Sequence, residues 1–323
     1  MTYWERPKPL DEPLSFSRRA ALLGVASLVA AACSPRHLAR RTIRLGYLPI
    51  AECTPLFVGQ ALGLFQRRGL NVELKEFQDG PTVISAAQGG SLDGGLSGVA
   101  PIFFALEKDI NIKLVGDGGH VVAAPHPYVG LVVGSNSPIK LPSELKGKTV
   151  AVNGLKTIEE ALLRVALAKA GIAGTVKVVE LPHPTMVQAL ESGIIDASMA
   201  IEPYISMGLG EGKIRILEGS EDIIPSFQIS AIFFTELFLS NHGDDLLLFS
   251  GAYNDAIDFI DKNPAQAKTI VSQWTGTPIA TSNQMTLPGW DKQLSIARLD
   301  AAKTAMLSNH IIDTDITLQK YVL

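Results

Sequence analysis

The sequence predicts an α/β protein of two domains, and three observations support this prediction. The chain has 323 residues, which at about 150 residues per domain suggests two domains. From Thr42 onward, short β-rich runs alternate with helical segments, as in sheets whose strands are connected by helices. The segment Ala86–Asp93 returns as Ala189–Asp196, and Gly69-Leu70 returns as Gly171-Ile172, both at an offset of about 102 residues. Each half of the chain therefore repeats one strand–helix pattern.

Strand and helix signals follow one another regularly through the first half. Thr54-Pro55 supplies an N-cap and a proline at the first helical position, and Pro81 opens a second helix that stops at Gly89-Gly90. A third helix follows Pro101. The strands expected here are Thr42–Tyr47, Asn71–Phe77, the segment around Gly95-Leu96, and Asn111–Val115.

The second half begins after a break at Pro125–Tyr128 and ends at a polar break at Gly219–Pro225. Within it, Thr157–Glu160 is a capping box that opens an amphipathic helix. The remaining elements expected are strands at Val129–Val133, Lys148–Asn153, Ile214–Leu217 and Phe227–Phe234, and a helix after Asp244 with the apolar stripe Leu246, Phe249, Tyr253, Ala256 and Ile260.

Composition excludes several classes of protein. Hydrophobic residues make up 46% of the chain and charged residues 19%, so the chain can form a core and is not disordered. A net charge of −4 argues against a nucleic-acid partner, which requires a surplus of Lys and Arg. The two cysteines cannot build a disulfide framework or a Cys-rich metal site. No apolar run reaches the roughly 20 residues that span a bilayer.

We expect residues 1–32 to be a signal peptide and residues 33–42 a tether. Ala20–Ala32 is an apolar stretch of 13 residues, and the Ser17-Arg18-Arg19 before it resembles a twin-arginine export signal, although general secretion also fits. Ala30–Cys33 resembles a bacterial lipobox whose Cys33 carries lipid, and it fits a simple signal-peptidase site as well. The expected location is the periplasm, with the protein held at the membrane by a lipid anchor.

Several short motifs along the chain form one recognisable set: Gly46–Pro49, Thr54–Val58, Gly63–Leu70, Leu145–Val152, Asp196-Ala197, Glu202–Tyr204 and Asn263-Pro264. Together they resemble one superfamily of periplasmic solute-binding proteins, which serve importers of sulfonates, taurine, nitrate, bicarbonate and thiamine-precursor pyrimidines. This resemblance implies a two-lobed, type II-like clamshell fold with mixed, mostly parallel sheets flanked by helices. In such a fold the chain crosses between the lobes at the two breaks, so we expect lobe 1 to comprise residues 43–128 plus 220–323, and lobe 2 residues 129–219. It also implies a small-molecule solute and a partner permease of the ABC type in the inner membrane. We expect the protein to be a monomer.

The candidate binding residues follow the carboxyl ends of the predicted strands, where ligands bind in open α/β sheets. Several of these ends run directly into helices, so free backbone N–H groups and the positive end of the helix dipole suit an oxyanion. Ser97-Gly98 is the preferred anion contact. The candidates are Glu52, Cys53, Thr54, Gln78, Asp79, Ser97 and Gly98 in lobe 1, and Asn153, Lys156, Thr157, His183 and Glu202 in lobe 2.

Charge leaves the kind of ligand open. Lys156 is the single cation on the predicted cleft loops, whereas Glu52, Asp79 and Glu202 are acidic. A simple anion suits the backbone amides, and an aminosulfonate would use both amides and a carboxylate. An aminopyrimidine would pair with a carboxylate and stack on an aromatic ring, for which the candidates are Tyr47, Phe57 and Tyr204.

Catalytic motifs are absent from the sequence. Gly95–Val99 lacks the final glycine of a nucleophile elbow, and the six histidines show no His-x-x-x-His spacing. We expect no metal, no cofactor and no enzymatic activity. An enzyme on the same two-lobed fold is the alternative.

Overall fold

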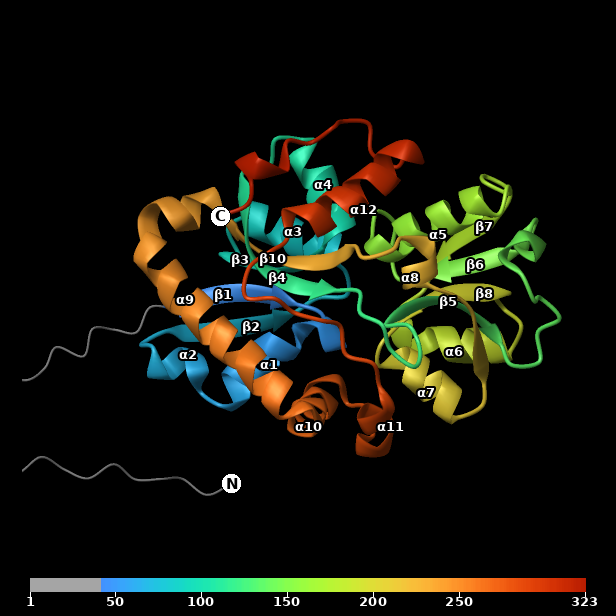
Figure 1. Cartoon of the computed structure of the whole chain (residues 1–323), viewed down its shortest axis with the longest axis horizontal. Coiled ribbons are helices and arrows are strands. Elements are labelled where there is room, and N and C mark those ends of the chain that lie inside the picture. The colour runs from blue at the N-terminus through green and yellow to red at the C-terminus, as the bar shows by residue number, and fades with distance from the viewer. Residues whose placement is uncertain (1–41) are drawn as a thin grey trace, which may run out of the picture. The chain divides into compact units, whose positions relative to one another are not determined.

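Two five-stranded sheets organise residues 42–323, which are the residues that this computed structural model describes (Figure 1). The first sheet has the order β2-β1-β3-β10-β4. Its strands are β1 (Thr42–Tyr47), β2 (Asn71–Glu76), β3 (Gly94–Gly98), β4 (Ile112–His120) and β10 (Gln228–Thr235). The second sheet has the order β7-β6-β8-β5-β9. Its strands are β5 (Val129–Gly134), β6 (Thr149–Val152), β7 (Lys177–Glu180), β8 (Ala197–Ile201) and β9 (Ile214–Gly219).

The two sheets share one topology. β1 pairs in parallel with β2 and β3, as β6 does with β7 and β8. β10 runs antiparallel to β3 and β4, as β5 does to β8 and β9. β5 and β10 are the first strands in the sequence after the chain has passed from one sheet to the other. Each runs antiparallel to its two neighbours in the new sheet. The sheets are therefore mixed, with the repeated order that the recurring sequence landmarks indicated.

We call the first sheet with its helices lobe 1, and the second sheet with its helices lobe 2. In lobe 1, α3, α4 and α12 cover one face of the sheet and α1, α2, α9 and α10 the other (Figure 1). In lobe 2, α5 and α8 lie on one side, and α6 and α7 on the other (Figure 1). The helices are α1 (Thr54–Ala61), α2 (Leu64–Arg67), α3 (Gly80–Gln88), α4 (Val99–Leu106), α5 (Ile158–Lys169), α6 (His183–Glu191), α7 (Tyr204–Gly210), α8 (Ser220–Ile223), α9 (Glu236–Lys262), α10 (Pro264–Thr275), α11 (Ile279–Gln284) and α12 (Ile296–Ser308). Short 3₁₀ helices occur at η2 (Ala51–Cys53), η3 (Pro142–Leu145) and η4 (Leu318–Lys320).

Local capping signals explain where several helices begin. Thr157 caps α5 by accepting the Glu160 N–H at 3.3 Å, and Glu160 in turn accepts the Lys156 N–H at 2.5 Å. Asp79 caps α3 by accepting the Thr82 N–H at 2.8 Å. The N–H groups of Glu160 and Thr82 are backbone donors that a helix leaves unpaired in its first turn.

Helix α9 differs from its predicted extent. It begins at Glu236, eight residues before Asp244, because Thr235 accepts the Phe238 N–H at 3.2 Å and provides an earlier cap. The backbone leaves helical geometry at His242 (φ −149°), so the predicted segment corresponds to the part after this kink. The expected stripe is largely confirmed, since Phe249, Tyr253, Ala256 and Ile260 are all buried; Leu246 is only partly buried.

Two connections join the sheets, and a third segment bridges the lobes. Residues 121–128 lead from β4 to β5, residues 220–227 lead from β9 to β10, and α11 near the C-terminus contacts α7 of lobe 2. No helix among residues 42–323 is long and apolar enough to span a membrane. The predicted signal peptide (1–32), Cys33 and all of the predicted tether except Thr42 lie outside the described residues; Thr42 is the first residue of β1.

Candidate functional site

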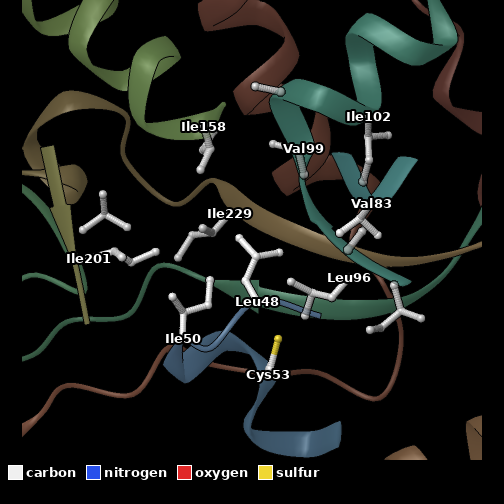
Figure 2. Packing of buried hydrophobic residues seen from close by; sticks show 14 of the residues in the cluster. Leu48, Ile50, Cys53, Val83, Leu96, Val99, Ile102, Ile158, Ile201 and Ile229 are labelled. Atoms are coloured by element: carbon white, nitrogen blue, oxygen red, sulfur yellow. The ribbon is translucent and has the colours of Figure 1, made fainter. Parts of the chain in front are cut away.

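A small cavity lies between the lobes at the carboxyl ends of the parallel strands. It has a volume of about 20 Å³, enough for about one water molecule. Leu48, Ile50, Leu96, Ile158 and Ile201 form apolar walls drawn from both lobes, and Figure 2 shows these five side chains converging. The other lining residues are Glu52, Gly80, Gly98, Pro101, Asn153, Thr157 and Glu159. We call this space the inner cavity.

A larger cavity of about 130 Å³ adjoins it and shares Leu48, Ile50 and Asn153 with it. The remaining lining residues come from the ends of β1 and β2 in lobe 1, and from the starts of α6 and α7 in lobe 2: Pro49, Glu76, Phe77, Gln78, Pro182, His183, Pro184 and Tyr204. We call this space the outer cavity. A solute occupying both cavities would contact both lobes.

Two larger hollows, of about 550 and 540 Å³, lie away from these strand ends. The first lies at the opposite end of the lobe 2 strands and is lined by Glu191, Asp196 and Lys213. The second lies at the opposite end of the lobe 1 strands and is lined by Asp93 and Phe238. If volume were the only criterion, these two hollows would be the candidate binding sites. The inner and outer cavities are the stronger candidates, because ligands in α/β sheets bind at the carboxyl ends of the strands.

Glu52 brings a carboxyl group into the inner cavity from lobe 1. It lies in η2, directly after β1, and its side chain is 2% exposed. Burial raises the pKa of Glu52 to about 8, and repulsion from Glu159 and Asp117 adds to the rise. Its Oε1 atom is buried without a hydrogen-bond partner among the described residues.

Glu159 brings a second carboxylate to the inner cavity from lobe 2. It is 3% exposed, and its Oε1 lies 3.3 Å from His183 Nε2. The His183 ring stacks on Tyr204, with ring centroids 5.4 Å apart. This row of three side chains runs from the inner cavity, which Glu159 lines, to the outer cavity, which His183 and Tyr204 line.

Asn153, Thr157 and Gly98 are the other predicted residues that line the inner cavity. Asn153 Oδ1 is buried and has no partner among the described residues. The Thr157 hydroxyl donates to the Gly154 carbonyl at 2.8 Å while it caps α5, so it is already engaged. A Cβ atom added to Gly98 would lie 3.2 Å from Ile158, which shows how closely the starts of α4 and α5 approach across the cleft.

Several other predicted residues do not line either cavity. The Cys53 thiol and the Thr54 hydroxyl are fully buried; burial raises the pKa of Cys53, and Thr54 donates to the Ala51 carbonyl at 2.5 Å. Ser97 is not a lining residue; its Oγ lies against Gly80, where an added Cβ would be 2.4 Å from it. Lys156 is exposed and places its Nζ 5.9 Å from the centre of the Phe104 ring.

Asp79 and Gln78 lie at the edge of the site. Asp79 is half-buried and engaged in capping α3, and its Oδ2 would lie 3.6 Å from a Cβ added to Gly154 of lobe 2. Gln78 is exposed and lines the outer cavity.

Glu202 is fully buried but lines neither cavity. It lies beside the connections between the two lobes and contacts three separate segments of the chain. Its carboxylate accepts the Ser206 N–H at 3.0 Å, the Ser206 hydroxyl at 2.8 Å and the Thr286 N–H at 3.1 Å. His126 Nδ1, in the segment between β4 and β5, lies 3.3 Å from the same group. Burial raises the pKa of Glu202 and these hydrogen bonds lower it. The geometry therefore gives this carboxylate a structural role.

The three aromatic side chains proposed to stack on a ligand also differ in whether they line a cavity. Tyr47 and Phe57 pack with Trp274 inside lobe 1, with centroids 4.8 to 5.7 Å apart. Only Tyr204 of the three lines a cavity. Sequence reasoning missed Glu159 and Glu76 as lining residues. Glu159 belongs to the predicted capping box, and its position in the first turn of a helix at a strand end was the available signal.

No lysine or arginine among residues 42–323 lines the inner or the outer cavity. The single cluster of described residues with metal-ligating side chains, Asp117, His120 and Asp291, lies outside both cavities. Arg298 already occupies it with its Nη2 3.3 Å from Asp117 and 2.5 Å from Asp291. The inner and outer cavities can therefore hold an apolar body and supply hydrogen-bond acceptors, and the arrangement offers no nucleophile paired with a base.

A family model described as "NMT1-like family" matches residues 37–275. Among curated relatives, a putative aliphatic sulfonates-binding protein of Escherichia coli is 31% identical over 209 residues, covering 63% of this chain and 61% of the relative. The corresponding protein of Bacillus subtilis is 27% identical, covering 74% and 71%. The nitrate import ATP-binding protein NrtC of Synechococcus elongatus is 28% identical, over 72% of this chain and 37% of its own length. The chain thus spans less than two thirds of the length of two of these relatives.

Solved structures share the fold. The alkanesulfonate-binding protein SsuA of Xanthomonas axonopodis pv. citri, bound to MOPS, superposes with a TM-score of 0.73 at 21% identity, covering 88% of this chain and 99% of that one. The periplasmic nitrate-binding protein NrtA of Synechocystis superposes with a TM-score of 0.71 at 13% identity, covering 88% and 86%. At such identities the likeness shows the architecture, which is that of periplasmic binding proteins.

Proposed function

Because this chain belongs to the NMT1-like family, we propose that it is the solute-binding protein of an ABC-type importer. It captures a small organic or oxyanionic solute between its lobes and presents the closed form to a permease in the inner membrane. The relatives named for sulfonate binding and nitrate import support this assignment, and make sulfonates, taurine and nitrate the first solutes to test.

The position of the two cavities carries the proposal. Both are lined from both lobes at the carboxyl ends of sheets with the same topology. A solute held there gains contacts only when the lobes are together, so binding shifts the equilibrium toward the closed arrangement. In the structure the side chains that line the inner cavity leave almost no free volume, so a solute enters only when the lobes separate.

The proposal includes the location of the protein. Export to the periplasm rests on the predicted signal peptide (1–32), and tethering rests on lipidation of Cys33. A monomer suffices, because both lobes that line the cleft belong to one chain.

A thermal-shift screen of the purified mature protein tests the proposal, with sulfonates, taurine, nitrate, bicarbonate, amino acids and pyrimidines as candidate solutes. A solute that binds only the folded state at about 100 times its Kd adds about 2.7 kcal/mol of stability and raises the melting temperature. The solute should be recovered unchanged after incubation. Conversion of a bound solute into product would favour the enzyme alternative, and a screen without any stabilising solute would contradict the proposal.

A further inference from the structure

The connection between β4 and β5 carries a histidine whose ring is surrounded by polar atoms from both lobes. The His126 side chain is 17% exposed, and its Nδ1 atom lies 3.3 Å from Glu202 Oε1 and 3.1 Å from the Thr286 hydroxyl. Its Nε2 atom lies 3.2 Å from the Gln284 carbonyl oxygen and 3.5 Å from the Ser206 hydroxyl. We call these five residues the hinge cluster, because they lie beside the first connection between the lobes.

The described groups that contact the ring nitrogens offer acceptors and no free donor. A carbonyl oxygen only accepts, so Nε2 carries a proton to bond with Gln284. The hydroxyl protons are already used, since Ser206 donates to Glu202 Oε1 at 2.8 Å and Thr286 donates to the His126 carbonyl at 2.8 Å. Nδ1 therefore faces acceptors as well: the Glu202 carboxyl, the Thr286 oxygen and, at 3.4 Å, the carbonyl oxygen of the following residue. A proton between Nδ1 and Glu202 satisfies both groups, whereas its loss leaves two acceptors facing each other.

The hinge cluster connects parts of the chain that belong to different lobes. The segment that carries Thr286 is held to lobe 1 on both sides. Before it, the Ser282 hydroxyl donates to a carbonyl of α10 at 2.7 Å, and after it, Gly289 exchanges backbone hydrogen bonds with His120 of β4 at 2.9 and 3.0 Å. Glu202 directly follows β8 of lobe 2, and α11 lies between α10 and α7 (Figure 1). Rotation of one lobe against the other therefore changes the distances within the cluster.

We propose that the hinge cluster is a proton-dependent latch that stabilises the closed arrangement of the lobes. A proton held between His126 and Glu202 makes their contact attractive, and its loss weakens the contact and favours opening. When the lobes rotate apart, the two groups are no longer held face to face, so the closed form binds more protons than the open form. The ratio of closed to open protein therefore falls as pH rises. The inference takes hinge closure from the proposed function and goes beyond it, because it concerns the control of closure and not the solute.

Three other ionisable groups of the described chain bear on the pH dependence of closure. Lys268 of α10 donates to the Asn283 carbonyl at 3.0 Å, and its attraction to Glu202 favours the carboxylate. Tyr128, whose hydroxyl accepts the Glu52 N–H at 3.0 Å, stays neutral because burial raises its pKa well above the ordinary value. Glu52 lines the inner cavity with a pKa of about 8, so opening hydrates it and also couples closure to pH. The test therefore uses protein in which Glu52 is replaced by glutamine.

Spin labels on the two lobes measure closure without any solute. Two exposed positions beside the cleft, Gln78 of lobe 1 and Leu155 of lobe 2, are replaced by cysteine in mature protein that carries Glu52→Gln and Cys33→Ser. Electron paramagnetic resonance between the labels then gives the ratio of closed to open protein at pH 6 and pH 8. We expect this ratio to be at least about threefold higher at pH 6, within the limit of about tenfold per pH unit that one proton allows.

Two variants remove the latch in different ways. His126→Asn keeps an amide donor for Glu202 but binds no proton, and Glu202→Gln removes the carboxylate. Either change should make the ratio independent of pH, with circular dichroism confirming native folding. His310→Asn is the matched control, because this histidine is exposed and lies outside the hinge cluster, and asparagine tolerates its positive φ of 51°. The control should keep the pH dependence of the labelled parent protein.

The contrary outcomes are distinct. A ratio of closed to open protein that does not change between pH 6 and pH 8, or one that changes equally in His126→Asn, would overturn this inference. Labels that stay at one separation at both pH values would overturn it as well. None of these results touches the proposed function, because no solute takes part in the measurement and the thermal-shift screen tests solute binding separately.

Discussion

Glu52 places an ionisable side chain where water has almost no access. It follows β1 directly, its exposure is 2%, and no basic residue among those described lines the cavity beside it. Burial raises its pKa from the ordinary 4.5 to about 8, because a carboxylate loses its hydration there. The folded protein therefore keeps a proton that the unfolded chain releases above its ordinary pKa.

This difference predicts how stability depends on pH. Between about pH 4.5 and 8 the folded state binds more protons at Glu52 than the unfolded state, so the free energy of unfolding should fall as pH rises, by up to about 1.4 kcal/mol per unit. Glu52→Gln removes this contribution. Urea unfolding at pH 5 and pH 8 should show the variant gaining stability relative to the wild type at the higher pH, whereas Glu73→Gln should not. An equal pH slope in wild type and Glu52→Gln would show that Glu52 is already ionised.

At the scale of elements, the starts of α4 and α5 face each other across the cleft. Gly98 is the N-cap of α4, which follows the central strand β3, and Thr157 is the N-cap of α5, which follows β6. The absence of a side chain at Gly98 leaves room for Ile158, which would lie only 3.2 Å from a methyl group at that position. Closure therefore depends on a small residue at this point.

Replacing Gly98 by leucine should prevent complete closure, because the new side chain meets Ile158 before the lobes come together. We expect the affinity for any solute identified by thermal shift to fall at least tenfold, about 1.4 kcal/mol, while the fold is retained. Calorimetry and circular dichroism measure the two effects. Gly210→Leu is the matched control, since nothing lies within 4 Å of a Cβ atom added there. Wild-type affinity in Gly98→Leu would place the site elsewhere.

At the scale of the whole molecule, the crossings between the lobes are held by buried polar contacts. Glu202 of lobe 2 binds Thr286 of the C-terminal segment and lies beside His126 of the first crossing. Its carbonyl also accepts the Ala51 N–H from lobe 1 at 3.3 Å. These contacts lie next to the cleft without lining it, so they keep the connections in register while the cavity stays available for a solute.

The proposed export and lipid anchoring give a separate prediction. If Cys33 carries lipid, the anchor and the basic residues Arg36, Arg40 and Arg41 together hold the protein at an anionic membrane. Cys33→Ser should move the mature protein from the membrane fraction to the soluble periplasmic fraction. Cys53→Ser controls for loss of a thiol, because this buried residue lies in the folded part. An unchanged membrane fraction in Cys33→Ser would exclude the lipid anchor.

The sequence alone predicted the α/β class, the repeated halves and the Thr157 cap of α5, and it placed the expected site at the carboxyl ends of the strands. These features depend on contacts between residues close in the chain or on patterns that repeat along it, such as the Thr157 cap and the alternation of strands with helices. The family resemblance added the two-lobed fold, which the comparisons confirm.

Only the tertiary structure decided which side chains at those strand ends enter the cavity. Ser97 does not line the inner cavity although its neighbours Leu96 and Gly98 do, because successive residues of a strand point to opposite faces. Glu202 is held by contacts with Ser206 and Thr286, the latter distant in sequence. Glu159 enters the cavity opposite Glu52 because α5 of one lobe approaches η2 of the other. Such approaches depend on how the two lobes pack, and no local pattern in the chain records them.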